Sequence, residues 1–289
     1  MTIQEKLYSK LNTVKNFILF LIARTKSDTI LRVASSLSYT SLIALVPLFA
    51  IGLAIFSAFP VFSGVREQLQ SFLLTAFTPD IGSEIEEYFD SFIGATSGLT
   101  TLGVVGLAIT AILMLSTIEN SFNFIFKVTK ARRLTTKITL YWTVITLGPL
   151  LLGAALSLRG YIQMMPQELV NTSAFRLALP NILTILFLVL VYMLVPNRKV
   201  KILHAMTGSF VAVILLSLLR TFFKTIVVNG AMYKTLYGAL ATLPILLVWM
   251  YCVWAVVIFG AVITSALGEF KEENIEKTIT NTTKQKNKK

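Results

Sequence analysis

The stretch "YGALATLPILLVWMY", Tyr237 to Tyr251, decides the fold class of this chain and carries a proline, Pro244, near its middle. A proline lacks the amide proton that a helix interior needs, and its ring clashes with the preceding turn. The surrounding segment, Thr235 to Gly268, holds no Asp, Glu, Lys or Arg in 34 residues. A helix needs about 20 apolar residues to cross a bilayer. This segment therefore predicts a membrane-spanning helix that bends near its proline.

The rest of the chain has the same character. Of its 289 residues 55% are hydrophobic and 14% are charged, whereas a soluble domain has about 25% charged residues. Five more stretches lack charge, which gives six stretches of 18 to 34 residues: Val33 to Val65, Ser91 to Ile118, Ile138 to Leu158, Leu177 to Asn197, Ile202 to Leu219 and Thr235 to Gly268. The sequence predicts an all-α polytopic membrane protein with six transmembrane helices, several of them kinked by proline.

The basic residues predict the orientation of these spans. Loops rich in Lys and Arg stay on the cytoplasmic side, and 20 of the 26 such residues fall in the two terminal segments and in alternate loops. Both termini are therefore expected in the cytoplasm. The net charge of +12 follows from this asymmetry and from a lysine-rich tail. It favours anionic lipid headgroups as partners, not nucleic acid.

Three regions follow from this topology. Residues 1–32 form a cytoplasmic N-terminal segment with apolar residues along one helical face, which predicts an amphipathic helix on the inner leaflet or one packed on the bundle. Residues 33–268 form the transmembrane domain. Its external loop, 63–95, is predicted to hold two amphipathic helices whose acidic residues are a solvated face or a cation-gathering cluster. Residues 269–289 are a cytoplasmic polar tail, expected to fray beyond about Lys277.

Several kinds of chemistry find no support. The chain has one His and one Cys, and no Gly-rich phosphate loop, HExxH, GxSxG or paired-Cys motif is present. No metal, cofactor or catalytic residue is expected, and the protein is not expected to be an enzyme. The six charge-free stretches hold no acid, and Val262 in the last of them is apolar, so no acid is expected deep in the membrane. This argues against transport that is coupled to protons or cations through a buried carboxylate.

Prolines and small residues suggest how the helices pack. Pro47, Pro149, Pro196 and Pro244 stand within or at the ends of spans, with hydroxyls upstream of Pro47, Pro149 and Pro244 that could replace the lost backbone bonds. Bent helices are common in membrane bundles, and they also surround the cavities of transporters. Small residues predict close helix approach in the second and sixth spans: Gly98, Gly103, Gly106 and Ala111, then Gly260, Ala261 and Ser265.

Four stretches resemble one family: "ASSLSYTSLIALVPLFAI", "ENSFNFIFKVTKARR", "YWTVITLGPLLLGAAL" and the long run from Tyr233 to Lys271. They are similar to the YihY family of bacterial inner-membrane proteins, also called BrkB-like and once labelled ribonuclease BN. The resemblance covers Val33 to about Lys271. It implies six spans, cytoplasmic termini and a role in envelope or lipid-related transport. No residue supports the ribonuclease label.

The resemblance also implies candidate site residues. The family's first-span tyrosine, leucine and proline fall on Tyr39, Leu42 and Pro47. Its paired asparagines fall on Asn120 and Asn123, and its last Tyr-Gly and proline on Tyr237, Gly238 and Pro244. The two asparagines are three residues apart, on one helical face, where they would bond another helix's backbone or form part of a site. One departure is Val262, where relatives commonly have glutamate.

Cations near the outer boundary complete the candidate pathway. Arg159, Arg176, Arg220 and Lys224 would snorkel to headgroups or ring an entrance for an anion. Arg220 is the cation expected to touch a substrate.

Two functions remain open from the sequence. One is a permease for an amphipathic, anionic or lipid-like solute in envelope homeostasis, and the other is a non-transporting scaffold or regulator of envelope integrity. A continuous cavity lined by Tyr39, Asn120, Asn123 and Arg220 would favour the permease, and a solid core would favour the scaffold. A homo-oligomer and an envelope partner both remain open.

Overall fold

The computed structural model of the chain describes residues 3–58, 101–130, 132–143, 173–229 and 242–286. Within these ranges the secondary structure is helical and no strand occurs. The helices are α1 (Ile3–Ser27), α2 (Ile30–Ala58), α5 (Thr101–Ile125), α7 (Ser173–Leu194), α8 (Ile202–Asn229) and α10 (Thr242–Lys286). A further helical segment occupies residues 134–143. The predicted all-α class is confirmed for this part of the chain.

Two helices are long and apolar enough to cross a membrane within the described ranges, at Ile202–Thr225 and Pro244–Phe270. Shorter apolar segments occupy parts of α2, α5 and α7, at Ile30–Ala44, Ile109–Ile125 and Asn181–Leu194. Most of the predicted third span and the external loop 63–95 lie outside the described residues. The number of six spans therefore stays a prediction.

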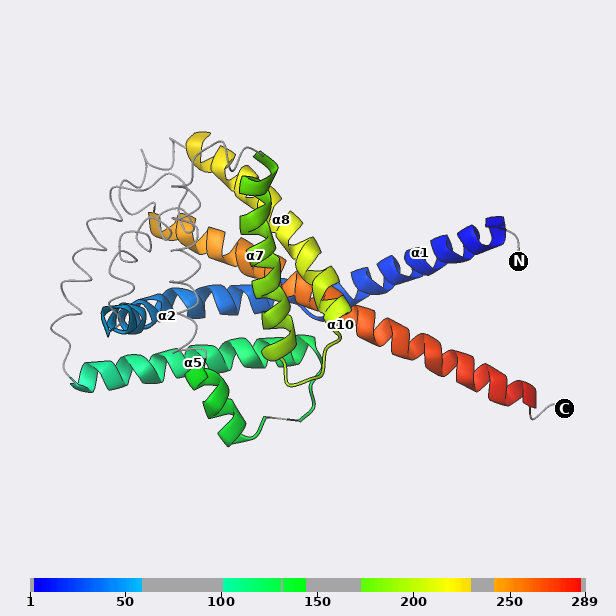
Figure 1. The fold of residues 1–289 in the computed structure, drawn as a ribbon, viewed down its shortest axis with the longest axis horizontal. Helices are drawn as coiled ribbons and strands as arrows, with labels where there is room; N and C mark the ends of the chain where they lie inside the picture. The colour runs from blue at the N-terminus through cyan, green and yellow to red at the C-terminus, as the bar shows by residue number, and fades with distance from the viewer. Residues whose placement is uncertain (1–2, 59–100, 131, 144–172, 230–241, 287–289) are drawn as a thin grey trace.

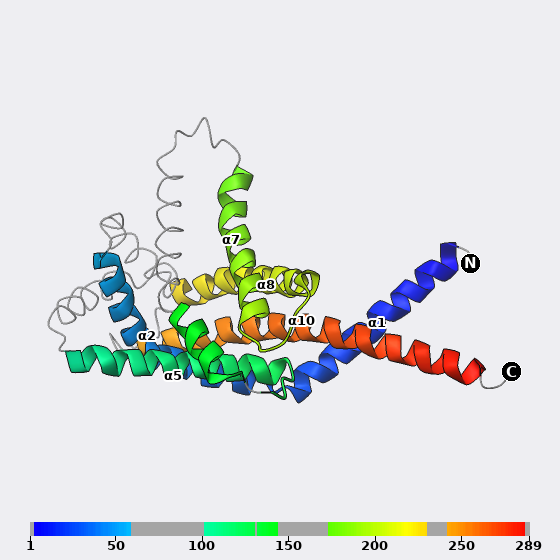
Figure 2. The same cartoon turned by 60° about the horizontal axis from the view of Figure 1, so that its bottom comes forward.

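Helix α10 is the centre of the bundle. It packs against α8 and α2, and α2 packs in turn against α5, while α7 crosses α8. Figure 1 and Figure 2 show α1 and the C-terminal part of α10 leaving the bundle at the same end, where both chain termini lie. Apolar side chains of α2, α5, α7, α8 and α10 form the core, and Phe122, Ile258 and Val262 in it are fully buried.

The closest approach between helices lies where α8 crosses α10. A Cβ atom added to Gly260 would lie 2.3 Å from the Tyr192 hydroxyl oxygen and 2.9 Å from the Gly208 carbonyl oxygen. The Tyr192 hydroxyl donates a hydrogen bond of 2.7 Å to the Val257 carbonyl. The small residues of the sixth span thus mark close packing. Gly106 does not, because it is exposed and a Cβ added there would meet nothing within 4 Å.

The prolines occupy two different settings. Helix α2 continues through Pro47, and the half of the helix that contains it turns away from the rest (Figure 2). Thr40 donates to the Ser36 carbonyl, and Ser41 accepts a bond of 2.9 Å from the Trp254 indole. Pro244 is exposed and stands in the first turn of α10 as described, where a missing amide proton costs little. Pro149 lies outside the described residues.

Helix α10 also extends further than expected. It runs without a break through residue 269 and ends at Lys286, whereas the sequence predicted fraying beyond about Lys277. Adding a residue to an existing helix is far easier than nucleating a new one. A long span can therefore carry a polar extension that would be a weak helix by itself.

Candidate functional site

The carboxyl end of α5 is capped by both backbone and side-chain hydrogen bonds. Lys127 takes a left-handed conformation, with φ of 51°, and the amides of Val128 and Lys127 bond the carbonyls of Asn123 and Phe124 at 2.9 and 3.1 Å. This is a Schellman cap. The next two carbonyls bond side chains from elsewhere: Ile125 accepts from Arg24 Nη2 at 2.8 Å and Phe126 from Arg198 Nη1 at 3.2 Å.

Five charged side chains meet at this helix end and are called here the Glu269 cluster: Arg24, Asp28, Lys127, Arg198 and Glu269. Arg24 is buried and pairs with Asp28 at 2.6 Å and with Glu269. Lys127 Nζ and Arg198 Nη1 lie 3.2 and 3.8 Å from the Glu269 carboxylate. Three cations thus face two carboxylates. The carboxyl end of α5 supplies about half a further negative charge, so the charges of the cluster are close to balanced.

A second group, the Glu119 cluster, repeats this arrangement with Arg132, Lys137 and Tyr141. Glu119 is 2% exposed and accepts a hydrogen bond of 2.5 Å from the Tyr141 hydroxyl. Arg132 Nε and Lys137 Nζ lie 3.5 and 3.9 Å from its carboxylate. Arg132 Nη2 also donates to the carbonyl of Leu194, at 3.0 Å. The Glu119 cluster also has one cation more than it has carboxylates. One of its cations, Arg132, lies against the carboxyl end of a helix, here α7.

Asn123 joins these two helix ends. Its Oδ1 accepts a hydrogen bond of 2.7 Å from the backbone amide of Asn197, and Asn197 Nδ2 donates to the Lys130 carbonyl at 3.0 Å. The sequence offered a bond to another helix's backbone as one of two roles for the asparagine pair, whereas Asn197 lies in the connection that follows α7. Asn120 is exposed.

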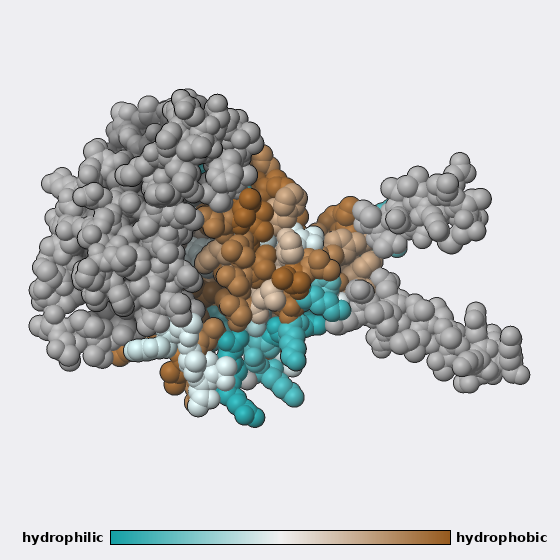
Figure 3. Space-filling view, in the orientation of Figure 1, coloured by the Kyte–Doolittle hydropathy of each residue, from teal (hydrophilic) through white to brown (hydrophobic). Residues whose placement is uncertain are grey.

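Exposed cations surround the two clusters. Lys127, Lys130, Arg133, Lys199 and Lys201 are exposed, and Figure 3 shows this hydrophilic surface as a teal area bordering the brown apolar surface of the bundle. The three carboxylates of the region, Asp28, Glu119 and Glu269, are instead turned into the protein and paired. The outward charge at this end of the described bundle is therefore positive.

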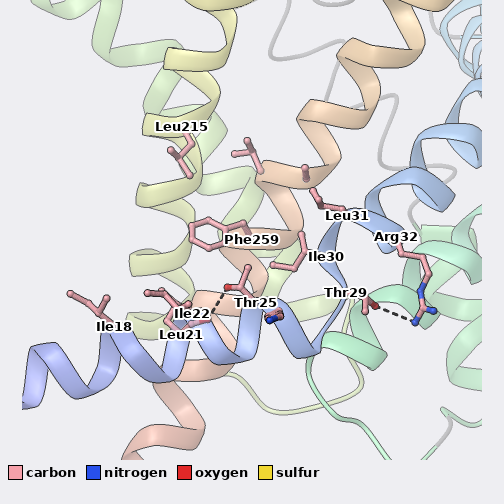
Figure 4. Close-up of a pocket in the computed structure, with 13 residues that line it drawn as sticks. Ile18, Leu21, Ile22, Thr25, Thr29, Ile30, Leu31, Arg32, Leu215 and Phe259 are labelled. Atoms are coloured by element: carbon pink, nitrogen blue, oxygen red, sulfur yellow. Dashed lines mark hydrogen bonds between the residues drawn. The ribbon is translucent and has the colours of Figure 1, made fainter.

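An apolar groove lies beside the Glu269 cluster, between α1, the start of α2, α8 and α10. Its volume is about 1070 Å³, slightly above the range of about 300 to 1,000 Å³ for small-molecule sites. The close-up in Figure 4 shows its walls. They are lined by Ile18, Leu21, Ile22, Thr25, Lys26, Thr29, Ile30, Leu31, Arg32, Leu215, Ala255, Val256 and Phe259.

The position of α1 forms this groove. Arg24 fixes the last turns of α1 to α5 and α10, and the Phe17 and Phe20 rings lie 5.4 and 5.9 Å from the Phe270 ring. Ile18 and Ile22 stay exposed. The C-terminal half of α1 packs on the bundle, while part of its apolar surface stays open.

The predicted pathway residues do not gather around this groove. Tyr39 is 63% exposed, and Asn120 and Arg220 are exposed as well. None of these three, nor Asn123, lines the groove. Arg159, Tyr237 and Gly238 lie outside the described residues. The roles proposed for these residues remain predictions.

Sequence reasoning missed most of the charged residues that the structure brings together. It singled out Asn123, but not Arg24, Arg132 or Glu269. Placement was a usable signal for Glu119 and Glu269, which directly follow charge-free stretches, but not for Arg24, which stands nine residues before one. No group of three or more His, Cys, Asp or Glu residues that could hold a metal occurs among the described residues.

Comparison with known proteins shows which family this chain is similar to. The family model described as virulence factor BrkB matches residues 21–285. A UPF0761 membrane protein of Rhodospirillum rubrum is 44% identical over 268 residues, which cover 90% of this chain and 61% of that protein.

Two further relatives are covered more fully. UPF0761 membrane proteins of Photobacterium profundum and of Aliivibrio fischeri strain ES114 are each 37% identical, over 89% and 93% of this chain and 82% and 88% of theirs. No solved structure matches the chain. The relatives' names describe membrane proteins and give no reaction.

Proposed function

The chain belongs to the virulence factor BrkB family of membrane proteins, and on that premise we propose that it is a permease-like protein of the bacterial inner membrane for an amphipathic, anionic, lipid-like solute. The observation that carries this proposal is the groove of about 1070 Å³ between α1, α2, α8 and α10. A site for a small hydrophilic solute needs polar groups that replace its water. This groove is walled mainly by aliphatic and aromatic side chains, which suit a hydrocarbon chain.

The arrangement of the helices also supports entry from the side. Ile18, Ile22 and Leu31 line the groove and are themselves exposed, so its rim is apolar as well as its floor. Exposed apolar surface of this kind faces lipid tails in a membrane protein. A lipid-like solute could therefore pass between bilayer and groove without crossing water.

The test is lipid flux in proteoliposomes, measured with fluorescent anionic and zwitterionic lipids. Leu215→Trp adds bulk inside the groove. Leu203→Trp adds the same bulk to the same helix at an exposed position that does not line it. Flux of the anionic lipid should exceed that of empty liposomes and fall several-fold in Leu215→Trp, with Leu203→Trp unchanged. No flux above empty liposomes for any lipid would contradict the proposal.

A non-transporting scaffold is the second candidate. It is favoured by the exposure of Tyr39, Asn120 and Arg220 and by the tight crossing of α8 and α10, which leaves a solid core at that crossing. In that case the outward cations and the arms formed by α1 and α10 would hold partners. Absent flux, combined with recovery of one defined envelope protein by in-cell crosslinking from exposed positions, would establish this alternative.

A further inference from the structure

The groove has a polar end and an apolar end. In Figure 4, Leu215 and Phe259 lie along α8 and α10 on one side of α1, while Thr25 and Thr29 lie at the level of α1 and its junction with α2. Two hydroxyls thus stand beside one end of an otherwise apolar wall. An occupant with a polar head and a hydrocarbon tail would match a groove that is polar at one end and apolar at the other.

The charge at the polar end is positive and unopposed. Lys26 and Arg32 line the groove and both are exposed. Arg32 Nη2 donates a hydrogen bond of 3.2 Å to Thr29 Oγ1, and in Figure 4 its guanidinium lies beyond Thr29 as seen from Phe259. Neither cation forms an ion pair within the described residues, and none of the groove-lining residues named above is acidic. Arg24, two residues before Lys26, is different because Asp28 and Glu269 neutralise it.

The backbone at this end is held in an uncommon conformation. Thr29 has a φ of 46°, a left-handed conformation that is unfavourable for a β-branched residue. Its carbonyl accepts the amides of Arg32 and Val33 at 2.9 and 3.2 Å. The turn that separates α1 from α2 by only two residues therefore keeps Lys26 and Arg32 on the same short stretch of chain.

We propose that this groove binds one anionic phospholipid of the cytoplasmic leaflet, with its phosphate at Lys26 and Arg32 and one acyl chain along Phe259 toward Leu215. Charge complementarity selects this occupant, because arginine and lysine are the usual phosphate ligands of proteins. The apolar wall selects a lipid and not a free phosphate. This inference rests on the proposed lipid-like solute and names its class and its contacts.

The experiment measures lipid binding to the purified full chain in nanodiscs of phosphatidylcholine that contain a small fraction of phosphatidylglycerol. Lipids bound to the protein are identified after transfer to detergent, by native mass spectrometry. Two exposed cations should favour phosphatidylglycerol over phosphatidylcholine by roughly 30-fold. Lys26→Gln with Arg32→Gln should remove most of this preference. Lys130→Gln with Arg133→Gln is the charge-matched control at another exposed site and should keep it.

A second arm locates the hydrocarbon chain. Phosphatidylglycerol with a photoactivatable acyl chain should label peptides that contain Phe259 and Leu215, and Leu215→Trp should reduce the labelling. Millimolar inorganic phosphate should not displace the lipid. Equal loss of preference in both double variants would overturn the proposal, as would displacement by free phosphate or labelling confined to other peptides.

The binding experiment and the flux experiment test the site and the permease function separately. Selective binding without flux would contradict the permease function and leave the site standing. Flux that persists in Leu215→Trp while no lipid is retained would remove the site and leave transport to another route.

Discussion

At the scale of single residues, Glu269 has the largest predicted effect on stability. Its carboxylate pairs with Arg24, whose side chain is 3% exposed. Glu269→Gln would leave that guanidinium buried, with Asp28 as its remaining carboxylate partner. Breaking a buried pair from one side costs about 3 to 5 kcal/mol, and the retained Asp28 places the expected loss at the lower end. Thermal unfolding of the detergent-solubilised protein, followed by tryptophan fluorescence, measures it.

Lys127→Gln is the matched control for this prediction. It removes another partner of the same carboxylate, but the Lys127 side chain is 57% exposed and lies 3.2 Å from it. Exposed ion pairs contribute about 0 to 1 kcal/mol, so this variant should unfold close to the native temperature. If both variants lost the same stability, the burial of Arg24 would not explain the cost of removing its partner.

The same residues show what the sequence could predict at this scale. Asn123 was identifiable, because an amide at the end of a span is a usual donor or acceptor between helices. Arg24 and Glu269 were not, because they stand 245 positions apart and nothing local to either one names the other. Residue type and distance from a span end indicated where charge would collect. Which charged residues pair with one another could be seen only in the folded structure.

At the scale of helices, the crossing of α8 and α10 gives a second test. Gly260→Ala would place a methyl group 2.3 Å from the Tyr192 hydroxyl and 2.9 Å from the Gly208 carbonyl. The helices would have to separate or Tyr192 would lose its bond to Val257. Overpacking of this kind costs about 1 to 3 kcal/mol, and chemical or thermal unfolding in detergent measures it.

Gly106→Ala makes the same substitution on α5, where nothing lies within 4 Å. Alanine is favoured over glycine in a helix interior by up to about 1 kcal/mol. This variant should therefore unfold at the native temperature or slightly above it. A loss as large as that of Gly260→Ala would mean that glycine itself, and not close packing, limits these helices.

The sequence predicted the helices better than their contacts. Charge-free stretches located α2, α5, α7, α8 and α10, because a bilayer requires long apolar segments. The sequence predicted close helix approach at Gly106 and at Gly260 alike, yet Gly260 lies in a tight crossing and Gly106 does not. Small residues permit a close approach, whereas the partner helix decides whether one occurs.

At the scale of the whole molecule, the two termini lie at one end of the bundle, as Figure 1 shows. The exposed cations Lys130, Arg133, Lys199 and Lys201 belong to the described connections at that end. The positive-inside rule then predicts that this end is cytoplasmic. Green fluorescent protein fused to either terminus should fluoresce, and alkaline phosphatase fused there should be inactive. Active phosphatase at either end would reverse the proposed orientation.

The function followed from the sequence only in outline. Composition and charge asymmetry predicted a membrane protein, and its family membership is shown by the comparisons. The predicted pathway residues Tyr39 and Arg220 were chosen by type and position along the spans, and they are exposed in the described structure. The groove combines α1 with α8 and α10. No local pattern in the sequence could indicate that three such distant segments share one wall.

The ion pair between Arg24 and Glu269 also bears on how the chain is made. The ribosome synthesises Arg24 first, and its partner follows 245 residues later, after every other described helix of the bundle has begun. Until then the guanidinium has only Asp28 close along the chain, and the end of α5 lacks its bonds from α10. Each nascent chain can therefore bond Arg24 to the end of α5 before α10 is made, whereas the pair with Glu269 forms only once the last helix is complete. A product truncated before residue 269 lacks this pair, so we expect proteases to cleave it more readily at the junction of α1 with the bundle.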